Sequence, residues 1–326
     1  MIRAAHLHTC GEPPHPVAVD EPVAGEGQAL VEVTAAPITP LDLLCASGTS
    51  YFGAPATPYV PGVQAVGVVR SSSRLSPGTR VWFPTSAGMA PGDGGMAELA
   101  VVADADLVPV AGTVADAQLA ALGLSAIAAW TALALRGELA AGERVLVLGS
   151  SGVVGTVGLQ AARLLGASAV FGAAIEPGAE DAALALGADG FVPLSRDDDV
   201  DGLAARMRDV VGEVDVVLDP LCGVPSSAAA LCLAPRGRLV NLGSSAAPTA
   251  TYSSTHLRSG SREVRGYTNN DLTAEQRLAA LTAIEEHAAA GRLRAPHEVF
   301  DVEDVATAWT RQARGEVHGR AVVTFT

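Results

Sequence analysis

The stretch Arg144-Val-Leu-Val-Leu-Gly-Ser-Ser-Gly-Val-Val-Gly155 decides the fold of this chain. The apolar run before the glycines is typical of a buried strand, and Val153–Leu165 has the composition of an apolar helix. Gly149 permits a tight turn, Gly152 lets the backbone approach a pyrophosphate, and Gly155 lets the helix pack closely on the strand. The spacing predicts a dinucleotide-binding turn, with phosphate at the helix N-terminus.

A second apolar strand, Ala169–Ala173, closes a βαβ unit of about thirty residues. The alternative is a glycine-rich turn in an α/β protein that binds no nucleotide. The candidate cofactor-binding residues are Gly149, Ser150, Ser151, Gly152, Val153, Val154, Gly155, Ala174, Glu176, Arg196, Leu242, Gly243 and Asn269.

The end of the second strand bears on the choice between NADPH and NADH. Ala174 stands where an acidic residue would accept hydrogen bonds from the ribose of NAD and repel a 2′-phosphate. An alanine in place of the acidic residue favours NADPH, with NADH as the alternative. Arg196 is a candidate ligand of the phosphate, and Glu176 is a candidate partner of the ribose instead.

Length and charge limit the remaining possibilities. The chain has 326 residues, enough for two domains, and 49% of them are hydrophobic. A formal net charge of −14 disfavours nucleic acid and anionic membrane surfaces as partners, because both carry negative charge. We therefore expect a small-molecule substrate. Only 4% of the residues are aromatic, and the candidate pocket loops, Tyr51–Tyr59 and Pro84–Met96, are small and apolar, which favours an uncharged or hydrophobic acceptor. All 21 basic residues are arginine, so no lysine can act as a general acid.

Cysteine spacing and the N-terminus indicate a cytoplasmic protein. The four cysteines are far apart, unlike those of a structural zinc site or a disulfide framework. The first residues lack a signal-peptide pattern. Val110–Trp130 comes nearest to a membrane span, but Asp116 and Gln118 are typical of a globular helix.

The distribution of strand and helix patterns predicts two domains, the first of them discontinuous. Residues 1–123 contain short strand patterns separated by turns, which indicates a mostly β domain. Residues 124–268 alternate strands and helices, which predicts a parallel sheet of about six strands. Residues 269–326 add helices over 274–291 and 302–313 and a final strand over 321–325, and we expect them to return to the first domain.

Several blocks in a fixed order resemble one family. They are Pro61-Gly-Val-Gln-Ala-Val-Gly-Val-Val69, Pro77-Gly-Thr-Arg-Val-Trp82, Gly95-Met-Ala-Glu98, Ala128-Ala-Trp-Thr-Ala-Leu133, the glycine turn, Leu186-Gly-Ala-Asp189 and Val214-Asp-Val-Val-Leu-Asp219. Over nearly its whole length the chain resembles zinc-independent medium-chain dehydrogenases/reductases, nearest to quinone oxidoreductases and enoyl reductases. The resemblance implies an α/β protein with a GroES-like, mostly β catalytic domain and a Rossmann domain with a doubly wound parallel sheet. It also implies a nicotinamide cofactor and a homodimer.

Residue types at the family's metal positions argue against zinc. Zinc members carry a cysteine after the first β region and a Gly-His-Glu block, because Zn²⁺ needs soft or imidazole ligands. Here the corresponding blocks are Ile38-Thr-Pro-Leu-Asp42 and Gly62-Val-Gln64. No cysteine, histidine or glutamate stands at those places, so we predict no metal ligands.

Without a metal, reduction of a simple carbonyl lacks a strong stabiliser for the alkoxide. Reduction of a quinone or enone does not need a metal ion, because hydrogen bonds can stabilise the delocalised charge that develops. Tyr51 is the leading candidate proton donor, by resemblance to a family tyrosine that faces nicotinamide and substrate; the alternative is a packing role. Thr39 is a second catalytic candidate, at a place where many quinone reductases have an asparagine. Asp42 is interpreted as ordering this loop.

The sequence leaves three functional hypotheses. The first is an NAD(P)H-dependent reductase of quinones or activated C=C bonds, a candidate tailoring enzyme of secondary metabolism. The second is an alcohol dehydrogenase or ketone reductase that works without zinc. The third is a nucleotide-binding protein that has lost catalysis.

Overall fold

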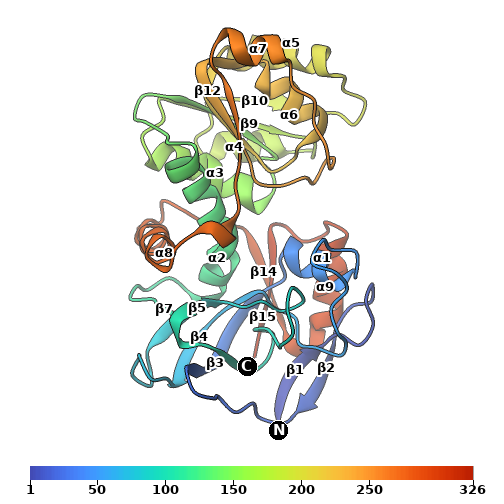
Figure 1. Ribbon diagram of the computed structural model, residues 1–326, viewed down its shortest axis with the longest axis vertical. Helices are drawn as coiled ribbons and strands as arrows, with labels where there is room; N and C mark the ends of the chain where they lie inside the picture. Colours follow the sequence, from blue (N-terminus) through green and yellow to red (C-terminus); the bar gives the residue numbers. More distant parts are fainter. Residues whose placement is uncertain (326) are drawn as a thin grey trace. The chain divides into compact units, whose positions relative to one another are not determined.

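The computed structural model describes residues 1–325, which form two compact units (Figure 1). One unit contains residues 1–124 together with the chain from Ala274 onward, and the other is Ser125–Thr273. The boundaries predicted from the sequence, 123/124 and 268/269, lie one and five residues away. The larger difference arises because Asn269–Asp271 forms a short 3-10 helix, η3, that continues the second unit.

The first unit is mostly β. Its elements are β1 (Ile2–His6), β2 (His15–Val19), β3 (Gln28–Pro37), α1 (Pro40–Ala46), β4 (Gln64–Ser71), β5 (Arg80–Pro84), β6 (Leu99–Ala103), η1 (Asp104–Asp106), β7 (Val108–Pro109), α8 (Ala274–Ala289), β14 (His297–Asp301), η4 (Val302–Asp304), α9 (Val305–Ala313) and β15 (Arg320–Thr324). β1 and β2 form an antiparallel ribbon, and a larger sheet has the order β14-β15-β3-β4-β5-β7, with β6 also paired to β3.

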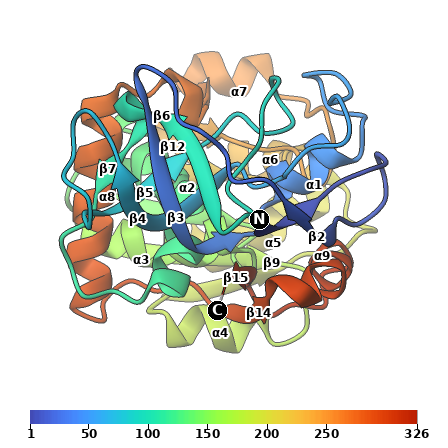
Figure 2. The same cartoon turned by 90° about the horizontal axis from the view of Figure 1, so that it is seen from below.

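The C-terminal segment returns to the first unit, as predicted. β15 pairs antiparallel with β3, with Val323 opposite Ala36. Figure 2 shows α9 beside β14 and β15, and α9 contacts both strands. Buried side chains from this segment, including Trp309 and Val305, join the apolar core of the first unit. The final strands therefore complete a sheet that begins more than two hundred residues earlier in the chain.

The second unit has a parallel sheet of six strands in the order β10-β9-β8-β11-β12-β13. Its elements are η2 (a π-helix, Ala132–Arg136), β8 (Arg144–Leu148), α3 (Val153–Leu164), β9 (Ala169–Ala174), α4 (Ala179–Ala185), β10 (Gly190–Pro193), α5 (Val200–Val211), β11 (Val214–Asp219), α6 (Gly223–Ala230), β12 (Leu233–Asn241), α7 (Ser254–Ser259), β13 (Glu263–Gly266) and η3. Numbered along the chain the strand order is 3-2-1-4-5-6, that of a doubly wound dinucleotide-binding fold. The predicted sheet is confirmed.

Helix α2 (Asp116–Thr131) starts in the first unit and ends in the second. Its backbone breaks at Gly123, where φ is 27° and ψ is −129°. The side chain of Gln64 explains the glycine, because a Cβ there would overlap Gln64 Oε1. The same oxygen accepts hydrogen bonds from Trp82 Nε1 and from the amide of Leu124, both at 2.8 Å.

The stretch 116–136 is long and apolar enough to cross a membrane by composition, as the pattern over Val110–Trp130 suggested. However, 67% of its most apolar window is buried in the protein. Such burial is typical of a core helix in a globular protein, which supports the interpretation from the sequence.

Candidate functional site

The glycine turn after β8 has the geometry that its sequence predicted. Gly149 has a φ of +61°, a left-handed conformation that favours glycine. A Cβ on Gly155 would overlap the carbonyl oxygen of Gly149 and lie 2.6 Å from Ser150 Cα. In contrast, a Cβ on Gly152 would meet its nearest atom, Gly149 O, at 3.5 Å. Gly155 is thus required by packing within the protein, whereas the space beside Gly152 is open.

The N-terminus of α3 presents free amide donors. Gly152 is the N-cap residue, and its missing side chain leaves the first turn without a side-chain cap. Among the described residues, no hydrogen bond is recorded from the amides of Val153, Val154 and Gly155 to a protein acceptor. These amides and the helix dipole favour an anion such as a pyrophosphate at this end.

One buried polar atom in the turn also lacks a partner. Ser150 is 4% exposed, and its Oγ makes no hydrogen bond within the part of the chain that the structure describes. A Cβ on Gly172 of β9 would lie 2.9 Å from this oxygen, so glycine keeps the space beside it. A turn with open space, free amides and an unsatisfied hydroxyl fits a dinucleotide phosphate.

The turn is joined to the end of β9 by a side-chain hydrogen bond. Ser151 Oγ donates to Glu176 Oε2 at 2.5 Å, and both residues are exposed. Ala174 ends the strand and is buried, with its carbonyl oxygen accepting from the amide of Leu194. Arg196 is exposed three residues beyond the end of β10, the strand next to β9.

The next parallel strands end in a connected polar group. Asp219, at the end of β11, is fully buried and accepts hydrogen bonds from the amides of Leu221 and Cys222 and from Asn241 Nδ2. Leu242 donates its amide to the carbonyl oxygen of Asp219, and a Cβ on Gly243 would lie 2.7 Å from Pro220 O. Leu242 and Gly243 are therefore held at the carboxyl edge of the sheet, where nucleotides bind in such folds.

Asn269 lies just past β13 and contacts a half-buried tyrosine, Tyr267. Tyr267 Oη donates to Asn269 Oδ1 at 2.6 Å and lies 2.5 Å from Thr131 Oγ1. The amide of Tyr267 donates to the carbonyl oxygen of Asn241, which ties this segment to the end of β12. Burial raises the pKa of Tyr267 to about 12, although its hydrogen bond with Thr131 opposes the rise, so the phenol is neutral near pH 7.

In the first unit, Thr39 and Asp42 form a capping box at the start of α1. Thr39 Oγ1 donates to Asp42 Oδ2 at 2.7 Å, and the Asp42 amide donates back to Thr39 Oγ1. Asp42 also accepts from the amides of Thr39, Gly62 and Val63. The interpretation that Asp42 orders this loop is confirmed. The Thr39 hydroxyl proton is already donated, and a catalytic role for Thr39 stays a prediction.

Asp42 is fully buried near a buried arginine. Burial raises the pKa of Asp42, while the hydrogen bonds from Thr39, Val63 and Gly62 act in the opposite direction. Burial likewise lowers the pKa of Arg320 to about 10, against the attraction of Asp42. Arg320 also donates to the carbonyl oxygen of Ile38, so opposite charges and hydrogen bonds hold this part of the unit together.

Tyr51 lies in the loop after α1 and is 82% exposed. Its ring packs on that of Phe52, with centroids 4.1 Å apart. The loop is shaped by Ser50, which accepts the amide of Phe52 on its hydroxyl and the amide of Gly53 on its carbonyl. An exposed phenol is available to a ligand, which is compatible with the predicted donor. No recorded interaction joins Tyr51 to Thr39 among the described residues.

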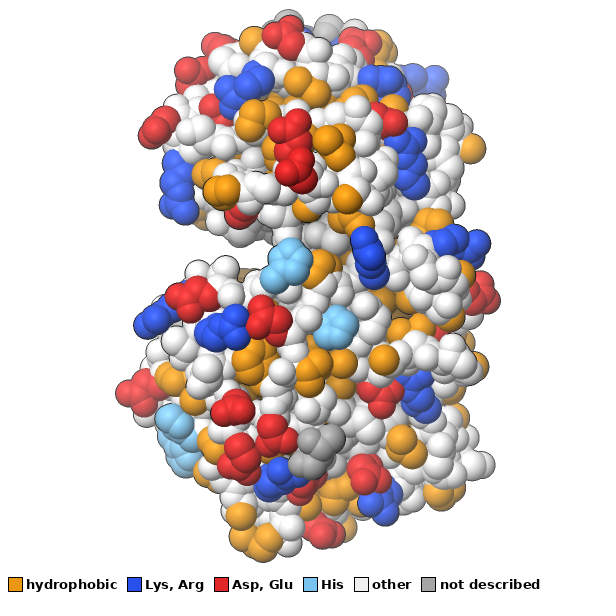
Figure 3. Space-filling model, turned by 180° about the vertical axis from the view of Figure 1, so that it is seen from behind, with side chains coloured by type: hydrophobic (Ala, Val, Ile, Leu, Met, Phe, Trp, Pro, Cys, Tyr) orange, Lys and Arg blue, Asp and Glu red, His pale blue; other side chains and the backbone are white. Residues whose placement is uncertain are grey.

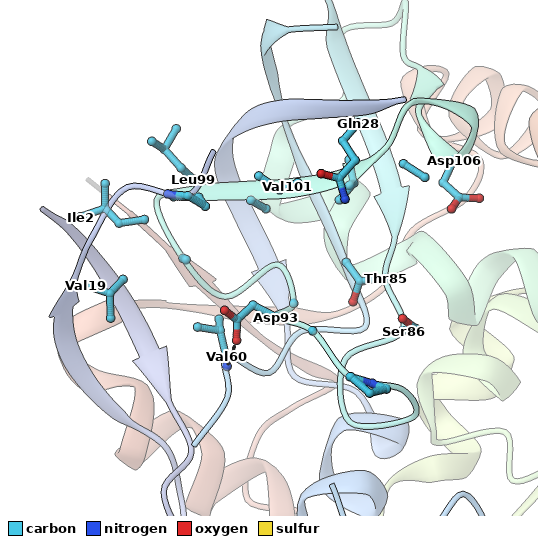
Figure 4. A pocket seen from close by; sticks show the side chains of 18 of the residues that line it. Ile2, Val19, Gln28, Val60, Thr85, Ser86, Asp93, Leu99, Val101 and Asp106 are labelled. Carbon is cyan, nitrogen blue, oxygen red and sulfur yellow. Dashed lines mark hydrogen bonds between the residues drawn. The ribbon is translucent and has the colours of Figure 1, made fainter. Parts of the chain in front are cut away.

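The first unit contains a cavity of about 480 Å³ (Figure 4). Its walls come from β1, β2, β6 and the loop after β5, with Ile2, Val19 and Leu99 on one side and Thr85 and Ser86 on the other. The loop Pro84–Met96, predicted to line a pocket, contributes much of the lining, whereas the predicted loop Tyr51–Tyr59 is absent from it. The lining contains three carboxylates and no arginine: they belong to Asp20, Asp93 and Asp106.

Within residues 1–325, no group of three or more histidine, cysteine, aspartate or glutamate side chains is placed to hold a metal ion. Cys10, Cys45, Cys222 and Cys232 are free thiols. On the face drawn in Figure 3, acidic and basic side chains are interspersed.

Sequence reasoning missed three parts of these sites. It did not predict the Asp219–Asn241 contact, the Tyr267–Thr131 contact or the hydrogen bond between Ser151 and Glu176. One signal was available, because Asp219 ends an apolar strand and is followed by Pro220. The other pairs join residues 136 and 25 positions apart, which no local pattern reveals.

Comparison with known proteins places both units in one family. A family model described as "Alcohol dehydrogenase GroES-like domain" matches residues 25–112, and one described as "Zinc-binding dehydrogenase" matches residues 153–285. A quinone oxidoreductase of Mus musculus is 32% identical over 226 residues, which is 68% of this chain and 66% of that protein. A phenolphthiocerol/phthiocerol polyketide synthase of Mycobacterium tuberculosis is 31% identical over 91% of this chain, but the match spans only 14% of that much longer protein.

Solved structures agree with this placement. The quinone oxidoreductase of Thermus thermophilus, which was also solved in complex with NADPH, is 27% identical. It superimposes with a TM-score of 0.81, covering 99% of this chain and 100% of that one. A probable oxidoreductase of Mycobacterium abscessus is 28% identical, with a TM-score of 0.83 over 99% of both chains.

Proposed function

Since the chain belongs to the medium-chain dehydrogenase/reductase family, in its quinone oxidoreductase branch, we propose that it is an NADPH-dependent oxidoreductase. Its acceptor in this proposal is a quinone or an activated C=C bond, and it works without zinc. The observation that carries the proposal is the turn after β8, where Gly149 and Gly155 form a tight, close-packed turn and α3 offers uncapped amides.

The residues present fit this cofactor. The amides of Val153, Val154 and Gly155 would hold the pyrophosphate, with the Ser150 hydroxyl beside them. Leu242, Gly243 and Asn269 lie at or beyond the carboxyl ends of β12 and β13, on the side of the sheet away from β9. In this strand order that side takes the nicotinamide half of a dinucleotide. When bound, NADPH supplies a hydride.

The acceptor needs hydrogen-bond donors and a proton from other groups. Tyr51 carries an exposed phenol, which can donate one hydrogen bond to a quinol or enolate oxygen. The Thr39 hydroxyl is already bonded to Asp42, which supports Tyr51 or water over Thr39 as the proton source. Conjugated acceptors suit such a site, because neutral donors can stabilise their spread charge without a metal ion.

The first unit has a cavity that suits a small, uncharged molecule, and neither Tyr51 nor Thr39 lines it. Its volume falls within the range of small-molecule sites. Apolar side chains such as Val19 and Leu99 are combined there with Asp20 and Asp93, and arginine is absent from the lining. A strongly anionic substrate would be repelled by these carboxylates.

We also propose that the chain is a cytoplasmic homodimer.

The test is oxidation of NADPH and NADH at 340 nm, with a metal chelator present, against small quinones and α,β-unsaturated ketones. Turnover in the chelator with a quinone, or formation of a saturated ketone from the enone, is the expected result. An allylic alcohol as the product would instead identify a ketone reductase. Tight NADPH binding without turnover of any acceptor would point to a protein that has lost catalysis.

A further inference from the structure

The loop after α1 displays two adjacent aromatic side chains at the surface. The chain has three tryptophans, four tyrosines and six phenylalanines, and all of them lie within residues 1–325. Among these described aromatic residues, only Tyr51 and Phe52 are exposed, with exposed fractions of 82% and 36%. The others are buried or half-buried. Two neighbouring exposed rings in a chain with so few aromatic residues indicate a surface that binds a ligand.

Hydrogen bonds give this loop a defined shape. Ser50 is buried, and its hydroxyl accepts the Phe52 amide at 3.2 Å, while its carbonyl oxygen accepts the Gly53 amide at 2.9 Å. Earlier in the loop, the Thr49 amide donates to Ser47 Oγ at 3.1 Å. These hydrogen bonds hold the backbone on both sides of the aromatic pair. The rings are therefore displayed before a ligand binds, which reduces the ordering cost of binding.

The two rings offer different groups to a ligand. Their centroids are 4.1 Å apart, and their planes are inclined by 37°. The ring of Phe52 has no polar atom, so its exposed surface suits an apolar or aromatic group. The adjacent phenol of Tyr51 can donate one hydrogen bond. Together the pair matches an aromatic ring system that carries a carbonyl oxygen.

The sequence around the pair is uncharged. Residues 43–69 contain no acidic, basic or histidine side chain, although 17% of the whole chain is charged. The segment therefore has no side chain that would attract a phosphate or carboxylate group of a ligand by charge. This composition favours a neutral ring system over a ligand that is held through an ionised group.

We propose that Phe52 is a specificity-determining residue whose ring stacks on the planar, fused rings of an aromatic quinone, while a carbonyl oxygen of the quinone meets the Tyr51 phenol. The proposal rests on the proposed function, because it assumes that Tyr51 faces the acceptor. Fused rings cover more of the Phe52 ring than a single ring does, and the gain in binding grows with the apolar area removed from water. The contribution of Phe52 therefore rises with the size of the flat acceptor.

The experiment is steady-state kinetics of the full chain with NADPH and three acceptors. They are 9,10-phenanthrenequinone, with fused rings, the monocyclic duroquinone, and 2-cyclohexen-1-one, which is not aromatic. Phe52→Leu keeps an apolar side chain but removes the flat ring, and Phe52→Tyr restores the ring. Val299→Ala is the matched control, because Val299 is an exposed apolar residue on β14 of the same unit. Each variant is compared with the wild type for the same acceptor, which cancels differences in reduction potential.

Phe52→Leu is expected to lower kcat/KM for the phenanthrenequinone about ten-fold, equivalent to about 1.4 kcal/mol, mainly through a higher KM. For the other two acceptors the loss should stay below about two-fold, because a smaller or non-planar molecule covers less of the ring. Phe52→Tyr and Val299→Ala should keep the wild-type values. The Kd of NADPH, measured by calorimetry, should be unchanged in all three variants.

Several results would overturn the inference while the proposed function stands. They are an equal effect of Phe52→Leu on all three acceptors, no effect on any of them, a weaker NADPH affinity in this variant, or a wild type that reduces the enone but neither quinone. Wild-type kinetics of Phe52→Leu together with a changed oligomeric state in light scattering would instead make Phe52 an interface residue. If the wild type reduces none of the three acceptors, the inference and the proposed function are both overturned.

Discussion

Two glycines of the turn after β8 should respond to alanine in different ways. In Gly155→Ala, the new Cβ would overlap the Gly149 carbonyl oxygen and lie 2.6 Å from Ser150 Cα, where ordinary contacts begin at 3.4 Å. Both obstacles are backbone atoms, so the turn must move. Such overpacking costs about 1–3 kcal/mol, and the better helix propensity of alanine returns up to about 1 kcal/mol.

We therefore expect Gly155→Ala to lose about 1–2 kcal/mol, which lowers the Tm by roughly 2–8 °C in a unit of this size. Its affinity for NADPH should fall as well, because the displaced turn carries the phosphate donors. In Gly152→Ala, the nearest protein atom to the new Cβ is 3.5 Å away, and φ is −74°. Replacing a glycine N-cap by alanine costs at most about 1 kcal/mol, so this variant should fold nearly as the wild type does.

The two variants separate packing from ligand approach. If Gly152 is present so that a pyrophosphate can come close, Gly152→Ala loses at least about ten-fold in NADPH affinity, or about 1.4 kcal/mol, with little change in Tm. Thermal unfolding by circular dichroism gives the Tm, and calorimetry gives the Kd. Wild-type affinity in Gly152→Ala would refute the argument for close approach. A wild-type Tm and Kd in Gly155→Ala would refute the argument from packing.

Three further outcomes are expected. Arg238 is buried and donates hydrogen bonds to both carboxylate oxygens of Glu143 and to backbone carbonyls. We expect Arg238→Met to lower the free energy of unfolding in urea by about 3–5 kcal/mol, because Glu143 loses its partner. A loss below about 1 kcal/mol would contradict the importance of this network. Hydrogen bonds from the Arg3 amide and guanidinium lower the pKa of Glu98 below its ordinary value of 4.5. The ionised Glu98 carboxylate therefore stabilises the folded protein above pH 4.5, and this contribution is lost as the pH falls through the lowered pKa. Glu98→Gln should therefore lose less stability than the wild type between pH 7 and about pH 3, and an equal loss would count against this pair. Tyr51→Phe should lower kcat for quinone reduction about ten- to hundred-fold with unchanged NADPH affinity, whereas an unaltered kcat would assign the proton to water.

The cofactor unit could be predicted from sequence because its signals are local. The apolar strand, the glycines and the start of α3 lie within a few residues of one another, and steric limits on Gly149 and Gly155 leave few arrangements for them. The return of β15 to the first unit was also predicted. The weak ribbon strand β2 was not, because His15–Val19 is largely half-exposed and has no clear alternation of apolar residues.

Contacts between distant residues could not be predicted in the same way. The break in α2 depends on Gln64, which lies about sixty positions earlier in the chain. Its side-chain oxygen accepts a hydrogen bond from the amide of Leu124, the residue after Gly123. The carboxylate of Glu285 accepts the amide of Gly112 from 173 positions away. Such partners are set by tertiary packing, and local patterns of hydrophobicity do not encode them.

The first unit shows what the residues at the family's metal positions do in this chain. Thr39 and Asp42 form hydrogen bonds with each other at the start of α1. Asp42 also accepts hydrogen bonds from the amides of Gly62 and Val63, the first two residues of the block Gly62–Gln64. Gln64, the last residue of that block, accepts from an indole and from an amide. These polar groups are used in hydrogen bonds that hold the loops and the break in α2. We therefore expect the chemistry of the first unit to come from groups outside this network, such as the exposed phenol of Tyr51.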